Sequence, residues 1–204
     1  MPLTQARGRG VRGLCLWGAL CTAWLATSAA RADGPAPWYL SLYAGRYSDQ
    51  HLYEDILGQK PLRFEDAWLV TAAVALPFSP GPSHRWEVEA QAGKYAGAQT
   101  EWEFNGLVIW RWTDFPWNRR LATTAALGEG VSYDTEIPPL ELASHTNTGT
   151  RRLLNYFMLE TTFGPPDADW ALLMRVHHRS GVFGLYGGVH GGSNVIAVGV
   201  KIGF

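Results

Sequence analysis

Apolar and polar side chains alternate along much of this chain with a period of two residues. From residue 196 to the end, every second position carries a large apolar side chain, with alanine, glycine or lysine between: Ile196, Val198, Val200, Ile202 and Phe204. Successive side chains of a β-strand point to opposite faces, so this pattern predicts a strand with one apolar face. The same alternation near residue 87 places Glu87 and Glu89 on the face opposite Trp86 and Val88.

The alternation recurs in eight segments separated by residues typical of turns. Their approximate ranges are 38–48, 65–79, 84–95, 99–113, 119–134, 151–164, 169–180 and 193–204. A tilted strand needs about 9–11 residues to cross a bilayer, and each segment is at least that long. After the first 32 residues the longest apolar run, 69–78, is interrupted by Thr71 and Pro77 and is too short for a spanning helix. The chain is therefore predicted to be all-β, with eight strands.

Two kinds of barrel fit eight alternating strands. A water-soluble lipocalin-like barrel turns its apolar face inward, whereas a membrane barrel turns that face to lipid and keeps small and polar groups inside. A narrow eight-stranded lumen is too small for the aromatic residues that share the apolar faces: Trp68, Trp86, Trp102, Phe104, Trp110, Trp112 and Trp170. A membrane barrel is therefore predicted, as a packed wall and not a pore. Its charged residues would point inward and neutralise one another: Glu87, Glu89, Glu103, Arg111, Arg175 and Lys201.

The connections between the predicted strands differ in length on the two sides of the barrel. Three are short and contain proline: 79–84, 113–119 and 164–169. Three are long: 48–65, 134–151 and 181–193. Short periplasmic turns and long outer loops are typical of outer-membrane barrels, and the C-terminal aromatic residue resembles the sorting signal of such bacterial proteins. We therefore predict an eight-stranded antiparallel up-and-down transmembrane β-barrel in the bacterial cell outer membrane, inserted by the barrel-assembly machinery.

The first 32 residues have the pattern of a secretory signal peptide. Arg7, Arg9 and Arg12 lead into an apolar stretch, and small residues follow up to Ala30-Arg31-Ala32, an A-x-A cleavage pattern. The alternative is a membrane anchor, but the apolar stretch is shorter than the roughly 20 residues that a spanning helix needs. We predict cleavage after Ala32, which divides the chain into a signal peptide, 1–32, and a barrel, 33–204.

Charge and cysteine content exclude several classes of function. The 18 acidic and 17 basic residues nearly balance, every carboxylate lies at or after Asp33, and no block of Lys and Arg offers a positive face to nucleic acid. Cys15 and Cys21 both fall in the signal peptide, so the barrel has no thiol for a disulfide, a zinc site or a nucleophile. Adjacent His177 and His178 point apart on a strand and cannot chelate one metal. No cofactor or metal is expected.

The segment 169–180 carries two polar residues on its apolar face. Trp170, Leu172, Met174 and Val176 share that face, and continuing the alternation adds His178 and Ser180 at the predicted outer rim. Side chains two positions apart on a strand lie on one face, where an imidazole can take the proton of a hydroxyl. The pair therefore predicts an acyl-transfer nucleophile, the other interpretation being two interfacial residues at a strand end.

The order of strands and the His178-Arg179-Ser180 motif near the C-terminus resemble the PagL-type lipid A 3-O-deacylases. Members of this family are eight-stranded outer-membrane barrels whose His-x-Ser motif faces the membrane from outside the barrel. The resemblance implies that Ser180 attacks an acyl ester of lipopolysaccharide, with His178 as the base. It also implies that the partner is lipid A in the outer leaflet.

The chain departs from this family in the third member of the triad. The family has a Glu early in the last strand, but no acidic residue follows Asp169 here, and alignment from the C-terminal aromatic places Asn194 there. An Asn can hold an imidazole in one tautomer, although loss of the carboxylate from a serine triad has cost about 10⁴ in turnover. Asn155, expected roughly opposite His178, is an alternative orienting residue. The Asn that usually follows the family's Ser is replaced by Gly181.

Two further points stay open at the level of sequence. Arg179, together with Arg151, Arg152 and Lys60, is a candidate for binding lipid A phosphates, the alternative being solvated loop charges. Because Asn194 stands where the family has its Glu, a second function is also open. A catalytically silent outer-membrane barrel with a structural or adhesion role would have the same strands and loops.

Overall fold

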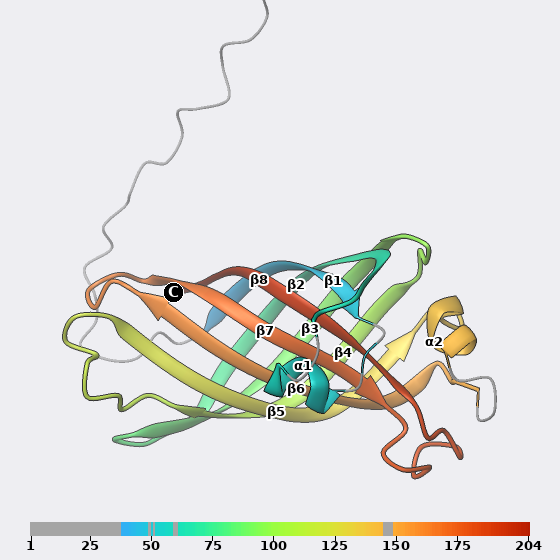
Figure 1. Cartoon of the computed structure of the whole chain (residues 1–204). Coiled ribbons are helices and arrows are strands. Elements are labelled where there is room, and N and C mark those ends of the chain that lie inside the picture. The colour runs from blue at the N-terminus through green and yellow to red at the C-terminus, as the bar shows by residue number, and fades with distance from the viewer. Residues whose placement is uncertain (1–37, 49, 51, 59–60, 145–148) are drawn as a thin grey trace, which may run out of the picture. The chain divides into compact units, whose positions relative to one another are not determined.

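Eight antiparallel strands, each paired with its neighbours in chain order, close into a barrel in the computed structural model (Figure 1). The strands are β1 Tyr39–Ser48, β2 Phe64–Pro80, β3 His84–Gly97, β4 Trp102–Trp112, β5 Ala122–Asp134, β6 Leu153–Gly164, β7 Trp170–Ser180 and β8 Gly192–Gly203. β1 also pairs with β8, which completes the closure. Every predicted strand is present, with its ends within three residues of the predicted ones.

The structure describes residues 38–48, 50, 52–58, 61–144 and 149–204. The predicted signal peptide, 1–32, its cleavage site after Ala32 and both cysteines lie outside the described residues, as does Lys60.

The long connections gather at one end of the barrel, which we call the loop end. α1, Leu52–Leu57, lies between β1 and β2, and α2, Pro139–Ser144, lies between β5 and β6. The connection from β7 to β8 leaves from the same end, because odd-numbered strands all finish there in an antiparallel barrel. Figure 1 shows the short turns at the opposite end. Neither described helix is long and apolar enough to cross a membrane.

The outward face of the wall is apolar and the interior is charged. Trp68, Trp86, Trp102, Phe104 and Trp170 are each at least 40% exposed on the outside. The six charged residues predicted to point inward are all at most 5% exposed: Glu87, Glu89, Glu103, Arg111, Arg175 and Lys201. An apolar exterior around a polar interior is the arrangement of a transmembrane barrel, so the predicted fold class is confirmed.

The interior charges are paired with one another. Arg111 donates from Nε to Glu87 Oε1 at 2.8 Å and from Nη2 to Glu160 Oε1 at 2.7 Å. Arg175 bridges Glu89, with Nη1 and Oε1 2.7 Å apart, and Glu160. A buried charge without a partner is costly, and this pairing offsets the cost of burying these charges in the interior.

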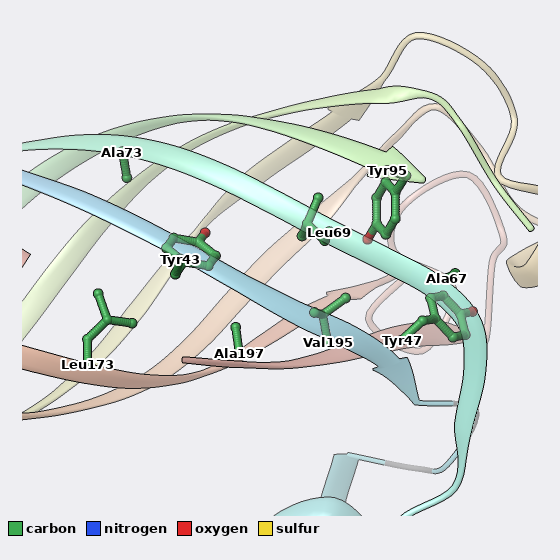
Figure 2. Close-up of a cluster of buried hydrophobic side chains, with 9 residues drawn as sticks. All are labelled: Tyr43, Tyr47, Ala67, Leu69, Ala73, Tyr95, Leu173, Val195 and Ala197. Atoms are coloured by element: carbon green, nitrogen blue, oxygen red, sulfur yellow. The ribbon is translucent and has the colours of Figure 1, made fainter. Parts of the chain in front are cut away.

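Buried apolar side chains occupy the interior beside these charges. Figure 2 shows such a cluster, with side chains from β1, β2, β3, β7 and β8 directed into the barrel: Tyr43, Tyr47, Ala67, Leu69, Ala73, Tyr95, Leu173, Val195 and Ala197. Tyr43 joins the two kinds of packing, because its hydroxyl donates to Gln91 Oε1 at 3.0 Å and accepts from Arg175 Nη1 at 3.3 Å. The filled interior leaves the outward face and the loop end as the places for a site.

Candidate active site

β7 places His178 and Ser180 on the outward face, at the loop end of the barrel. His178 is paired across the ladders with Phe157 on β6 and Asn194 on β8. Ser180, the last residue of β7, is paired with Asn155 and Gly192. The predicted position of Asn155 opposite His178 is therefore wrong by two residues. The turn between β6 and β7 sets the register and places Asn155 beside Ser180 instead.

His178 and Asn194 are joined by a short hydrogen bond. His178 Nδ1 lies 2.6 Å from Asn194 Oδ1, and Asn194 is 1% exposed although it points away from the barrel interior. The amide nitrogen of Asn194 donates to the backbone oxygen of Gln50 at 2.8 Å and to Asp55 Oδ2 at 2.7 Å. Both neighbours of that nitrogen are acceptors, so the amide oxygen must face the imidazole. Nδ1 of His178 therefore carries the proton, which leaves Nε2 as an acceptor.

The side chains of Ser180 and His178 both lie close to the backbone of Gly192. A Cβ atom at Gly192 would lie 2.8 Å from Ser180 Cβ and 3.1 Å from His178 Cε1. Only a residue without a side chain leaves both groups in place. The Phe157 ring stands edge-on to the imidazole on its other side, with ring centroids 6.4 Å apart and an interplanar angle of 79°.

A cavity of about 740 Å³ adjoins this pair. Its lining combines α1, β5 to β8 and the connection from β7 to β8, including Tyr53, Glu129, Phe183 and His190 with the His178 and Ser180 side chains. Phe183, at the edge of the cavity, is 93% exposed. Val182 and Phe183 have φ angles of 47° and 53°, in the left-handed region that side chains other than glycine rarely adopt. A cavity of this size suits part of a large amphiphilic ligand.

The connection from β7 to β8 is held by its own backbone hydrogen bonds. Gly181 donates to Gly191 O at 3.0 Å, and Gly184 donates to Val189 O at 2.9 Å. A Cβ atom at Gly181 would lie 2.0 Å from the Val189 oxygen. An Asn at this position, as the PagL-type family has, is therefore incompatible with this loop conformation.

Asn155 is held by Glu129, away from the imidazole. Its Nδ2 donates to Glu129 Oε1 and, at 3.1 Å, to the backbone oxygen of Gly130. The amide hydrogens of Asn155 are therefore donated to β5. Asn155 thus lies in the cavity wall beside Ser180, and Asn194 is the Asn that contacts His178.

Arg179 points into the barrel, so the prediction that it binds substrate phosphates is wrong. Its side chain is 1% exposed, with Nε 3.1 Å from Asp134 Oδ2 and Nη1 2.5 Å from Glu141 Oε2. It also donates to the backbone oxygens of Arg151 and Arg152. The physical reason is the alternation itself, because a residue between two outward-facing ones must face inward. Arg179 anchors α2 to the barrel.

His177 also faces inward, as predicted. Its Nε2 lies 2.6 Å from Glu103 Oε1, and its Nδ1 lies 3.1 Å from the Tyr156 hydroxyl. Within the described ranges no group of three or more His, Cys, Asp or Glu side chains has the geometry to hold a metal ion.

Sequence reasoning missed Asp55, which brings a carboxylate to the site from α1. The family resemblance places the acid on the last strand, whereas barrel closure pairs Ser48 at the end of β1 with Asn194. Asp55 follows seven residues later and accepts from Ser48 Oγ at 3.0 Å. The available signal was an acidic pair, Glu54-Asp55, in a connection that closure brings beside β8.

Comparison with known proteins supports the fold. No protein-family model and no curated protein sequence matches the chain. Among solved structures, the outer membrane enzyme PagL is similar, with a TM-score of 0.51 and 12% identity over 81% of this chain and 99% of that one. The two share a barrel fold. A de novo designed transmembrane β-barrel also matches, with a TM-score of 0.47 and 10% identity over 84% of this chain and 98% of the design.

Proposed function

We propose that this chain is a bacterial outer-membrane esterase that hydrolyses an acyl ester of lipid A. Ser180 is the nucleophile, His178 is the general base and Asn194 orients the imidazole. The observation that carries the proposal is the contact between His178 Nδ1 and Asn194 Oδ1, on the outward face and beside Ser180. The similarity of the fold to the outer membrane enzyme PagL adds support for the location. The substrate class is taken from the resemblance of the His178-Arg179-Ser180 motif to the PagL-type lipid A deacylases.

The proposed reaction passes through an acyl-enzyme. Nε2 of His178 accepts the Ser180 hydroxyl proton as Oγ bonds to the ester carbonyl carbon, and Asn194 holds the Nδ1 proton. The imidazolium then donates its Nε2 proton to the departing sugar oxygen as the ester C–O bond breaks, which releases the sugar hydroxyl. Water attacks the acyl-Ser180 ester next and gives its proton to His178, which returns the proton to Ser180 as the fatty acid leaves.

The outward position of the pair suits a substrate that lies in the membrane. Leu172 and Met174, which precede His178 on the same face of β7, are 56% and 54% exposed. An acyl chain packed along this face would place its ester near the cavity at the loop end. Lipopolysaccharide in the outer leaflet reaches such a site laterally, without entering the filled barrel.

The experiment is to express the protein in cells with defined lipopolysaccharide and to analyse lipid A by mass spectrometry, beside Ser180→Ala. The wild-type protein should remove one acyl chain, and the variant should leave lipid A intact. Folding of both proteins in the membrane is checked by the shift in electrophoretic mobility that folded barrels show before boiling. Unchanged lipid A with folded wild-type protein would contradict the enzymatic function.

That negative result would favour the second candidate, a catalytically silent barrel with a structural or adhesion role. One observation favours this candidate: the residue on β8 that contacts His178 is the amide Asn194 and not a carboxylate. An amide stabilises an imidazolium less than a carboxylate does.

A further inference from the structure

The geometry points to Asp55 of α1 as a positioning residue that completes this site in place of an acid on the last strand. It acts through Asn194, and the assignment deepens the proposed hydrolase function, on which its kinetic test rests. Asp55 Oδ2 accepts from Asn194 Nδ2 at 2.7 Å, and Asn194 Oδ1 in turn meets His178 Nδ1 at 2.6 Å. A carboxylate is thus linked to the imidazole through one amide.

Asp55, together with the backbone oxygen of Gln50, determines which end of the Asn194 amide faces the imidazole. If the amide were rotated by 180°, its oxygen would face two acceptors, Asp55 Oδ2 and the backbone oxygen of Gln50. Its nitrogen would then face Nδ1 of His178, which favours the tautomer with the proton on Nε2. That tautomer cannot accept a proton from Ser180 at Nε2. Asp55 therefore contributes to the selection of the imidazole tautomer that the reaction needs.

The charge of Asp55 also favours the imidazolium that forms during the reaction. A hydrogen bond to a carboxylate is stronger than one to a neutral acceptor, and linked hydrogen bonds polarise one another. The negative charge on Asp55 increases the negative partial charge on Asn194 Oδ1, where the Nδ1 proton of His178 is held. The effect is shielded from solvent, because Asn194 is 1% exposed and Ser48, which also holds Asp55, is fully buried.

The structural alternative is that Asp55 merely fastens α1 to the wall. Steady-state kinetics on lipopolysaccharide separate the two roles, using Asp55→Asn, which removes the charge, and Asp55→Leu, which removes every acceptor. We expect kcat to fall about tenfold for Asp55→Asn and about a hundredfold for Asp55→Leu, with KM unchanged. Glu136→Gln, which removes an equal charge from an exposed position in the connection between β5 and α2, serves as the control and should retain wild-type kcat.

Exchanging the two groups gives a sharper test. In an Asn194→Asp background the introduced carboxylate lies against that of Asp55, and like charges at this distance disfavour ionisation of both. Adding Asp55→Asn to that background should raise kcat by about tenfold, because the charge then lies directly on His178. The same substitution therefore lowers kcat in one background and raises it in the other. An equal fall in both backgrounds would overturn the positioning role.

A readout without substrate keeps this proposal separate from the proposed function. Nitrogen-15 NMR of histidine-labelled barrel in detergent distinguishes the two imidazole tautomers, and His178 is assigned by its loss in His178→Gln. Wild-type protein should show the proton of His178 on Nδ1, whereas Asp55→Leu should show a mixture of tautomers. An unchanged His178 signal in folded Asp55→Leu would refute the role of Asp55. If lipid A is unchanged by wild-type protein while the tautomer shifts, the positioning stands and only the hydrolase function fails.

Discussion

Substitution of Gly192 should displace Ser180 relative to His178. In Gly192→Ala the new Cβ would lie 2.8 Å from Ser180 Cβ and 2.5 Å from the backbone oxygen of Arg179. Carbon atoms in ordinary contact are about 3.5–4.0 Å apart, so Ser180 must move by at least about 0.7 Å. A displacement of about 1 Å in a catalytic group can lower the rate about a hundredfold. We therefore expect kcat to fall between about tenfold and a hundredfold.

The assay measures fatty acid released from lipopolysaccharide by the purified barrel in detergent. Gly106→Ala on β4 is the matched control, because a Cβ there would meet no atom within 4 Å. It makes the same chemical change on the same barrel and should keep wild-type kcat. Both variants should keep the mobility shift of a folded barrel. Wild-type kcat in folded Gly192→Ala would refute the view that Ser180 and His178 react over this glycine.

Two further substitutions test the orienting amide and the interior anchor. Asn194→Leu removes the acceptor for His178 Nδ1. It should lower kcat on lipopolysaccharide about a hundredfold with little change in KM. An unchanged kcat would exclude Asn194 as the orienting residue. Arg179→Met leaves Asp134 and Glu141 without their buried cation and should lower the free energy of unfolding by about 3 kcal/mol, measured as a shift of the urea midpoint in detergent. An unchanged midpoint would show that Arg179 does not anchor the loop end.

The pattern of side chains was sufficient to predict the strands and their faces. Alternation in 84–95 placed Glu87 and Glu89 inside and Trp86 outside, and these side chains have those positions in the barrel. The argument works because a narrow lumen excludes rows of tryptophan by volume alone. The same rule identified the outward position of His178 and Ser180.

Two predictions at the site were wrong, the outward direction of Arg179 and the position of Asn155 opposite His178. The first did not follow the alternation, and the second depended on more than the alternation. Arg179 lies between two outward residues, so its inward direction followed from the pattern that had been used for its neighbours. The cross-strand partner of Asn155 depended on how many residues form the turn between β6 and β7. A shift of the register by two residues moves the partner to the next position on the same face. Such a register is decided by the hydrogen bonds of the turn.

By itself, the sequence determined the number of strands, the face that each side chain occupies and the outward pair His178 and Ser180. These properties are local, because they depend on a two-residue period and on side-chain volume. Only the tertiary structure decided which carboxylate serves the pair. Closure of β1 against β8 brings Asp55 to Asn194 across 139 residues of chain, and the long connection between β1 and β2 has no period that would indicate this contact.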